Sequence, residues 1–185
     1  MIDDYLQDAR ERMHKSVDAT RHSFGSVRTG RASPGLLDRI VVEYYGTQTP
    51  LKQLATVSAA EARLLTVQPY DKSSIKAIER AIQESDLGLT PNNDGAVVRL
   101  QIPEMTEERR RDMVKVARQI AEEGRVAIRN VRRDVMHDLR ELKDAGEAGA
   151  DDEKRAEEAL QKLTDEKVKE LDASLKAKEA EILEV

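Results

Sequence analysis

Residues 105–145 read MTEERRRDMVKVARQIAEEGRVAIRNVRRDVMHDLRELKDA, and this stretch decides the fold. Its apolar residues recur at steps of three and four, which predicts one amphipathic helix roughly 60 Å long. Thr106 is a plausible N-cap, and Gly146 and Gly149 mark the break after it. The apolar positions are Met113, Ala117, Ile120, Gly124, Ile128, Val131, Val135, Leu139 and Leu142. A stripe of this length needs partner helices to cover it.

Two further stretches have the same periodicity and predict those partners. Residues 2–27 form the first, which is expected to end near Thr29-Gly30, because glycine tolerates the left-handed turn that closes a helix. Residues 151–183 form the second, opened by Asp151, Asp152 and Glu153. Since no stripe can remain exposed, we expect the three helices to pack as an elongated antiparallel bundle.

The middle of the chain has a different pattern. Three β-branched or apolar runs predict strands at 39–45, 62–68 and 96–102, and 73–85 predicts a short helix. The fold class is therefore α+β, with residues 1–30 and 105–185 forming a discontinuous bundle and residues 31–104 an inserted small β/α/β domain. Two crossings near 30–35 and 102–105 are expected to act as hinges, and a rigid elbow is the alternative. The hinge residues are Gly30, Arg31, Ala32, Ser33, Pro34, Ile102, Pro103, Glu104 and Met105.

Arginines gather on one face of the long helix. Arg118, Arg125, Arg129 and Arg132 fall within roughly 60° of one another on a helical wheel, and Arg133 widens the stripe. The whole chain has a net charge of −5, so this sorting is not an effect of composition. A guanidinium fork can bond two phosphate oxygens at once, so the face is a candidate for contact with a folded polyanion.

Composition excludes several classes of protein. The chain has 185 residues, one Phe and no Trp, which favours long helices over a large globular core. It has no Cys, and therefore no disulfide or thiolate zinc site. No apolar run is long enough to span a bilayer, and the N-terminus lacks a signal-peptide pattern. We expect a cytoplasmic protein without a membrane partner.

The sequence gives no support for catalysis or for a metal or cofactor. His14, His22 and His137 are isolated, and the serines and threonines have no convincing base partner. The glycines form no phosphate-binding loop. Tyr44 and Tyr45 are adjacent in a predicted strand, so one faces the core and the other is free to contact a partner. The pattern does not say which is which.

Five segments together resemble the bacterial ribosome recycling factors, and the resemblance runs from end to end. They are Val27–Pro34 (VRTGRASP), Val42–Thr47 (VEYYGT) continuing to Thr49–Leu51 (TPL) and Gln53–Ala55 (QLA), Ser85–Leu89 (SDLGL), Thr106–Arg110 (TEERR) and Arg125–Asp134 (RVAIRNVRRD). The resemblance implies an L-shaped protein whose bundle binds the 23S rRNA of the large ribosomal subunit. It further implies that elongation factor G, bound to GTP, acts against the small domain and separates the subunits after termination.

The resemblance also adds two residues to the candidate RNA contacts. Arg129 and Arg132 are selected both by the helical stripe and by the motif, whereas Arg28 and Arg31 rest on the motif alone. The full set of expected rRNA contacts is Arg132, Arg129, Arg125, Arg118, Arg133, Arg28 and Arg31. We expect a monomer that binds no DNA.

Two other functions remain open at the level of sequence. A helical adaptor would offer its apolar seams to another protein and would bind without strong salt dependence. An enzyme with a concealed site in the small domain would need a pocket with converging polar groups, which the sequence does not suggest.

Overall fold

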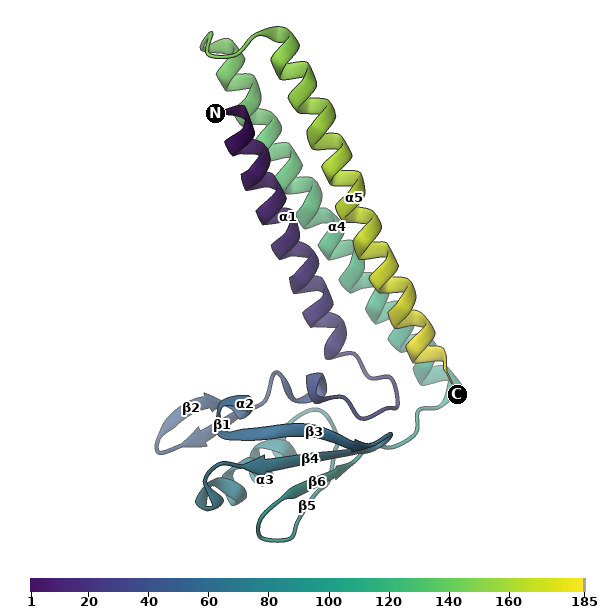
Figure 1. Cartoon of the computed structure of the whole chain (residues 1–185). Helices are drawn as coiled ribbons and strands as arrows, with labels where there is room; N and C mark the ends of the chain where they lie inside the picture. Colours follow the sequence, from purple (N-terminus) through teal and green to yellow (C-terminus); the bar gives the residue numbers. More distant parts are fainter. Residues whose placement is uncertain (185) are drawn as a thin grey trace. The chain divides into compact units, whose positions relative to one another are not determined.

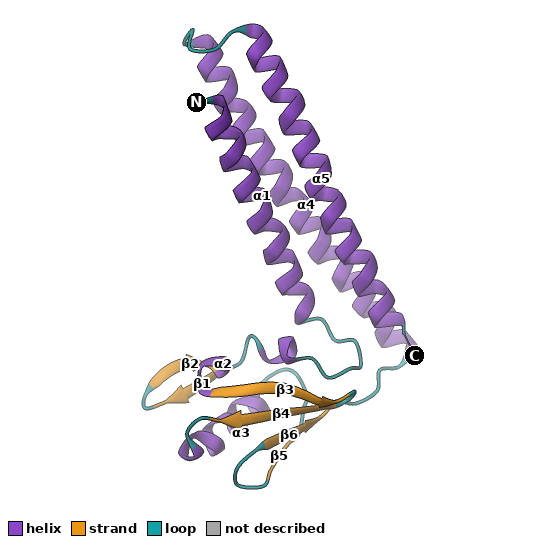
Figure 2. Ribbon diagram, viewed as in Figure 1, coloured by secondary structure: helices purple, strands orange, loops and turns teal. Residues whose placement is uncertain are grey.

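The computed structural model describes residues 1–184 and divides into two compact units (Figure 1). One unit holds residues 1–24 and 114–184, and the other holds residues 25–113. Long helices make up the first unit, and the second combines antiparallel strands with short helices (Figure 2). The predicted α+β class is confirmed. No helix within residues 1–184 combines the length and the apolar character needed to cross a membrane.

The helical unit contains α1 (Ile2–Gly25), most of α4 (Glu107–Asp144) and α5 (Ala150–Leu183), which lie side by side in Figure 1. Arg118 pairs with Glu179, and Arg140 lies 3.9 Å from Glu157. Residues later in α4 therefore contact residues earlier in α5, so the two helices run antiparallel. On the other side, Arg12 of α1 bonds Asp134 of α4 at 2.7 Å. The helices thus form the antiparallel bundle that the periodicity predicts.

The ends of α4 and α5 follow from local chemistry. Thr106 accepts a hydrogen bond from the backbone N–H of Arg109 at 3.1 Å, which is the predicted N-cap. Three acidic residues occupy the first turn of α5, where the helix dipole favours negative charge. One of them, Glu153, is buried and pairs with Lys143 at 2.8 Å, which joins the two helices next to their connection.

The first helix is shorter than predicted. It ends at Gly25 rather than near Thr29-Gly30. A Cβ atom at Gly35 would lie only 2.6 Å from the carbonyl oxygen of Gly25, so the backbone of a later segment packs directly on the last turn. Gly30 does adopt a left-handed φ of 79°, but it does so in the connecting loop. The helix therefore ends at a tertiary contact that periodicity does not encode.

The second unit contains two antiparallel sheets. A hairpin of β1 (Val41–Tyr44) and β2 (Thr47–Pro50) forms one sheet, and the other has the order β3-β4-β6-β5. Its strands are β3 (Ala55–Glu61), β4 (Leu64–Pro69), β5 (Pro91–Asn93) and β6 (Val98–Gln101). Two short helices, α2 (Leu51–Leu54) and α3 (Ile75–Glu84), and two 3-10 turns, η1 (Pro34–Leu37) and η2 (Lys72–Ser74), complete it.

Three strands, β2, β3 and β5, were not predicted from the sequence. Of these, β3 has among its seven residues three alanines, which have little preference for strands, and β5 is made of turn-forming residues. Both are stabilised by pairing with strands that were predicted: Ser58 lies opposite Thr66, and Asn92 opposite Arg99. Sheet partners, not intrinsic preference, place these segments.

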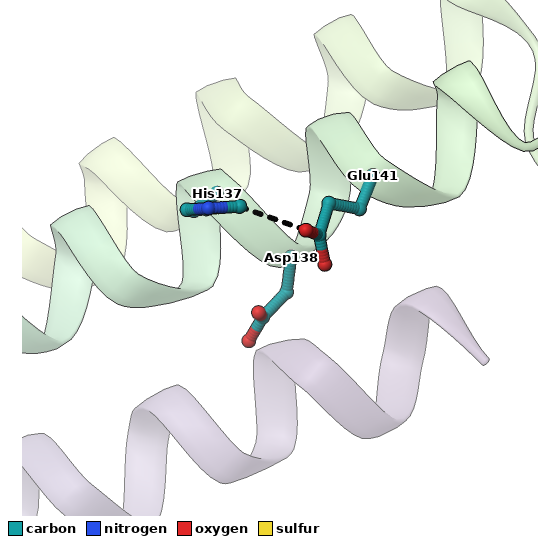
Figure 3. Close-up of side chains that lie close together, drawn as sticks. All are labelled: His137, Asp138 and Glu141. Atoms are coloured by element: carbon teal, nitrogen blue, oxygen red, sulfur yellow. Dashed lines mark ion pairs between the residues drawn. The ribbon is translucent and has the colours of Figure 1, made fainter.

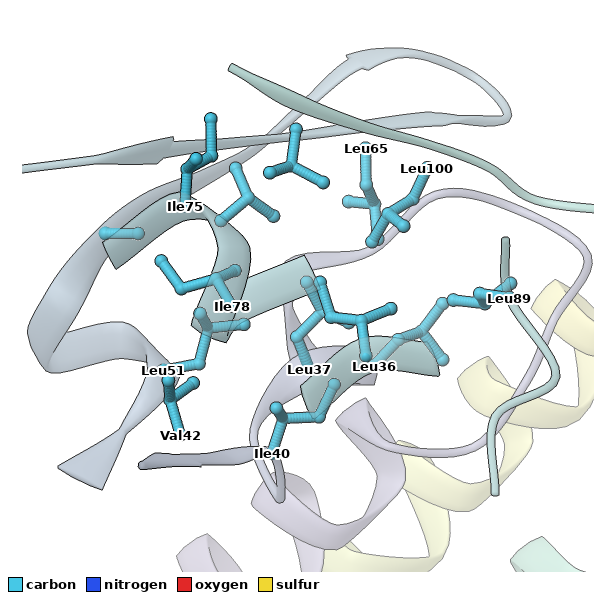
Figure 4. Packing of buried hydrophobic residues seen from close by; sticks show 14 of the residues in the cluster. Leu36, Leu37, Ile40, Val42, Leu51, Leu65, Ile75, Ile78, Leu89 and Leu100 are labelled. Carbon is cyan, nitrogen blue, oxygen red and sulfur yellow. The ribbon is translucent and has the colours of Figure 1, made fainter. Parts of the chain in front are cut away.

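One apolar cluster holds this unit together (Figure 4). Leu65 and Leu100 reach into it from the sheet, Ile78 from α3, and Leu37 from η1. All four side chains are fully buried. Alternation along β4 explains the arrangement, because Leu65 and Val67 face inward while Thr66 and Gln68 are more exposed.

Candidate nucleic-acid interface

The five arginines of α4 that the sequence selects as RNA contacts fall into two groups that differ in their partners. Arg118 donates from Nε to Oε1 of Glu179 at 2.7 Å, and Arg125 donates from Nε to Oδ1 of Asp172 at 2.8 Å. Both acceptors lie on α5. These two guanidinium groups therefore join two helices of the bundle, and an incoming phosphate would have to compete with those carboxylates.

The second group consists of Arg129, Arg132 and Arg133, here called the α4 arginine cluster. The Arg129 side chain is 54% exposed, and its Nη1 lies 3.6 Å from Oε1 of Glu122, beyond hydrogen-bond range. Arg133 is exposed and Arg132 is half-buried. Within residues 1–184 neither Arg132 nor Arg133 has a hydrogen bond or ion pair. The cluster thus keeps most of its donors available.

A groove on the surface of α4 collects these side chains. Its lining residues are Arg129, Arg132, Arg133, Met136, His137, Arg140, Glu141 and Asp144. Four guanidinium groups face two carboxylates, so the groove favours anions. Met136 lies at the centre of the arginine stripe and adds an apolar patch, which sequence reasoning did not single out.

Arg28 and Arg31 lie in the other unit. Arg31 is exposed, whereas Arg28 is half-buried and lines a small pocket with Leu87, Leu89 and Ile102. The Nη2 atom of Arg28 is enclosed and makes no hydrogen bond in the described chain. Of these two residues, Arg31 is the one presented to solvent.

The two predicted crossings lie next to each other. A Cβ atom on Gly30 would be 3.8 Å from the backbone nitrogen of Met105. Both crossings are also bonded to the turn between β3 and β4. The backbone N–H of Ala32 donates to the carbonyl of Ala62 at 2.7 Å, and that of Ile102 donates to the carbonyl of Arg63 at 2.8 Å. That these crossings bend remains a prediction.

His137 lies close to two carboxylates, Asp138 and Glu141, at one edge of the groove (Figure 3). The prediction from the sequence that this histidine is isolated is therefore wrong. Its Nδ1 lies 3.6 Å from Oε1 of Glu141, the ordinary spacing of an exposed pair one helical turn apart. Arg133 and Arg140 line the same groove and oppose a bound cation. We assign no metal to these three residues.

Together, a discontinuous three-helix bundle and a small antiparallel-sheet unit define a two-part α+β protein with a basic helix surface. A family model described as ribosome recycling factor matches residues 20–183. The chain is 57% identical over 180 residues to the ribosome-recycling factor of Rubrobacter xylanophilus, covering 97% of each chain. It is 55% identical to that of Halalkalibacterium halodurans over the full length of both. The chain belongs to the ribosome recycling factor family.

Solved structures agree with this assignment. A solution structure of the ribosome recycling factor matches with a TM-score of 0.76 and 41% identity, covering 100% of this chain and 98% of the other. A model of the Thermus thermophilus factor, described with Escherichia coli elongation factor G as bound to the post-termination complex, matches with a TM-score of 0.70, 46% identity and 99% coverage of both chains. The predicted family and its general role, ribosome recycling in protein biosynthesis, are confirmed.

Proposed function

We propose that this chain separates the subunits of the post-termination ribosome by binding the 23S rRNA of the large subunit through the α4 arginine cluster. Elongation factor G, bound to GTP, is the partner that drives the step. The observation that carries the proposal is the division among the α4 arginines. Two of them join helices to each other, while Arg129, Arg132 and Arg133 keep donors free for a ligand.

Phosphate is the ligand that fits this cluster. A guanidinium group offers several N–H donors in a fixed plane and keeps its charge at any physiological pH. Contact with a folded RNA through its backbone requires no stacking platform. The chain has one Phe and no Trp, which agrees with recognition by shape and charge.

The small unit and the crossings have a mechanical part in the proposal. A related factor is described together with elongation factor G in a post-termination complex, which supports the same partner here. GTP hydrolysis in that partner supplies the work, and the bundle transmits it to the bound RNA. The segments 30–35 and 102–105 act as the hinges, and the chain works as a cytoplasmic monomer that is not itself an enzyme.

A helical adaptor is the weaker alternative because of where the apolar seams lie. Met13 and Val17 of α1, Ile128 of α4 and Leu171 of α5 are fully buried within the bundle. These side chains are therefore already engaged with the other helices of the same chain. Docking another protein's helix on the seams would require the bundle to open.

The test is binding to purified large subunits, followed by a splitting assay. The variant Arg129→Ala/Arg132→Ala/Arg133→Ala should weaken binding at least tenfold, on the order of 1–2 kcal/mol in total, through the loss of charge-assisted bonds. Sucrose gradients of post-termination ribosomes with elongation factor G and GTP should then show intact ribosomes where the wild-type chain yields subunits.

A matched control is Arg10→Ala. Arg10 is an exposed arginine of α1 with no hydrogen bond or ion pair among the described residues, so it matches Arg133 in exposure and in its lack of partners. Its removal should leave both assays at the wild-type level. Near-normal binding by the triple variant, or equal losses in both variants, would exclude the α4 cluster as the RNA contact.

A further inference from the structure

The tip of the β1–β2 hairpin carries a strained residue. In residues 1–184, Tyr45 is the one non-glycine residue with a positive φ, 49°, and Gly46 follows it at 75°. Two positive φ values in a two-residue loop make a type I′ turn, in which Asn-Gly is the favoured pair. A tyrosine in the left-handed conformation is unfavourable relative to Asn or Gly, because its Cβ crowds the backbone.

Burial does not compensate this strain, because the Tyr45 side chain is exposed. Its relative exposure of 81% is the largest among the exposed large hydrophobic residues of the described chain. Tyr45 therefore disfavours the folded state through its left-handed backbone, and its exposed ring contributes no buried apolar surface in return. Such outliers are found preferentially at functional positions.

The Tyr45 ring is held in place by the ring of Tyr44. The rings of Tyr44 and Tyr45 meet edge to face, with centroids 4.5 Å apart. Tyr44 in turn donates its hydroxyl to Oδ2 of Asp71 at 2.9 Å, and Oδ1 of Asp71 accepts from the backbone N–H of Ser73 at 2.9 Å. One tyrosine is thus fixed at the start of η2, and the other is presented to solvent on top of it.

The charge around the tip points to a protein as the ligand. The hairpin Val41–Pro50 carries a single charged side chain, the exposed Glu43, and no arginine or lysine. The hydroxyl of Tyr44 is bonded to the carboxylate of Asp71, so the hairpin itself offers no cation for a phosphate beside the two rings. A rigid, exposed tyrosine is a frequent anchor in protein interfaces.

We propose that Tyr45 is a docking anchor, which inserts its ring into an apolar pocket on a protein that acts on the small unit. The inference rests on the proposed function, in which elongation factor G is that protein. Tyr44 is a positioning residue, since it supports the anchor and does not itself reach the partner. The strain at the turn is the cost of presenting a ring where Asn would fold more easily.

The experiment replaces the ring by the residue that the turn prefers. Tyr45→Asn removes the anchor and relieves the strain, so its melting temperature should equal or exceed that of the wild type. The rate of subunit splitting is then measured as the concentration of elongation factor G is raised. The concentration that gives half the maximal rate should increase roughly tenfold, as for the loss of an aromatic anchor.

The matched control is Tyr70→Asn. Tyr70 is a second exposed tyrosine of the same unit, at 71% exposure, with its hydroxyl 3.2 Å from that of Thr56 and no left-handed backbone. Its replacement should leave the dependence on elongation factor G unchanged. Tyr45→Gly is a second variant that relieves the same strain, and it should behave like Tyr45→Asn.

Binding to isolated large subunits separates a protein contact from an RNA contact. Tyr45→Asn should keep wild-type affinity there. Wild-type dependence on elongation factor G in both Tyr45 variants would overturn the inference and leave the proposed function intact. A weaker affinity for large subunits, with that dependence unchanged, would overturn it in favour of base stacking. A wild-type chain that splits no ribosomes would overturn the proposed function and this inference with it.

Discussion

Arg125 of α4 and Asp172 of α5 form a close ion pair across the bundle. The Nε and Nη2 atoms of Arg125 lie 2.8 Å and 2.7 Å from the same carboxylate oxygen, Oδ1. The arginine side chain is 21% exposed, so it is partly shielded from water. Arg132, two turns further along the same face, has no such partner within the described chain. Two arginines of one sequence stripe thus serve different purposes.

Arg125→Ala should therefore lower the stability of the bundle. We expect a loss of about 1 kcal/mol in the free energy of unfolding, because the pair is only partly screened by solvent. Arg132→Ala should change stability by less than about 0.5 kcal/mol, because this half-buried side chain has no partner in the described chain to lose. Urea unfolding followed by circular dichroism measures both. A larger loss of stability for Arg132→Ala than for Arg125→Ala would show that Arg132, and not Arg125, is the arginine that stabilises the bundle.

Gly124 supports a second prediction, about how closely the helices approach. It is buried, and a Cβ atom there would overlap the hydroxyl of Thr20 on α1 and lie 2.6 Å from Cδ1 of Leu171 on α5. Gly124→Ala gains helix propensity of about 1 kcal/mol, yet overpacking should outweigh it and lower stability by roughly 1–3 kcal/mol.

A double-mutant cycle checks this origin. Thr20→Ala removes the nearest clashing atom, so the pair Thr20→Ala/Gly124→Ala should lose less than the sum of the two single changes. If the two losses of stability simply add, the new Cβ atom at position 124 does not clash with Thr20. A stabilising Gly124→Ala would mean that the space beside Gly124 opens at little cost.

The sequence predicts the bundle well because its signal is local and repeated. Ala117, Ile128 and Val135 recur at helical spacing and are all buried as expected. At one end the prediction is off by one position: Met113 and Ile120 are only half-buried, while their neighbours Val114 and Ala121 are buried. Small shifts of this kind follow from how the helices cross, which depends on the partners.

The site could be predicted only in part, for a related reason. Placing Arg118, Arg125, Arg129 and Arg132 on one face needs only the pitch of a helix. Knowing that Glu179 and Asp172 pair with two of them needs the register between α4 and α5, because the paired residues lie 61 and 47 positions apart in sequence. Likewise, the helix end at Gly25 depends on the approach of Gly35. Long-range contacts decide both, and periodicity carries no record of them.

Asp94 gives the protein an acid-sensitive contact in the small unit. Its Oδ2 accepts from Arg99 at 2.6 Å, and its Oδ1 accepts from the backbone N–H groups of Val97 and Ala96 at 2.8 Å and 3.0 Å. The bond from Arg99, followed by those backbone bonds, holds the pKa of Asp94 well below its ordinary value. A lowered folded pKa stabilises the ionised form in the folded state, so this contribution is complete above the ordinary Asp range.

Asp94→Asn should therefore be less stable than the wild type at neutral pH. As the pH falls below the ordinary range of an aspartate towards the lowered pKa of Asp94, the wild type progressively loses the contribution, so the gap between the two proteins should narrow. Thermal melts of both proteins from about pH 7 to about pH 2 measure that gap, and all other carboxylates cancel in the difference. A gap that stays constant with pH would show that the charge of Asp94 is not what stabilises the turn.

The salt dependence of RNA binding is the sharpest measure of what the α4 arginine cluster contacts. Each phosphate neutralised by a protein cation releases condensed counterions, so the logarithm of the binding constant falls with the logarithm of the salt concentration by roughly 0.7–0.9 per contact. Removing Arg129, Arg132 and Arg133 together should flatten that slope by about 2 to 3, measured with large subunits between about 50 and about 200 mM KCl. Arg10→Ala, which removes one guanidinium group from α1, should leave the slope as it is. A triple variant that binds weakly with an unchanged slope would mean that the cluster contacts bases or protein instead of phosphates.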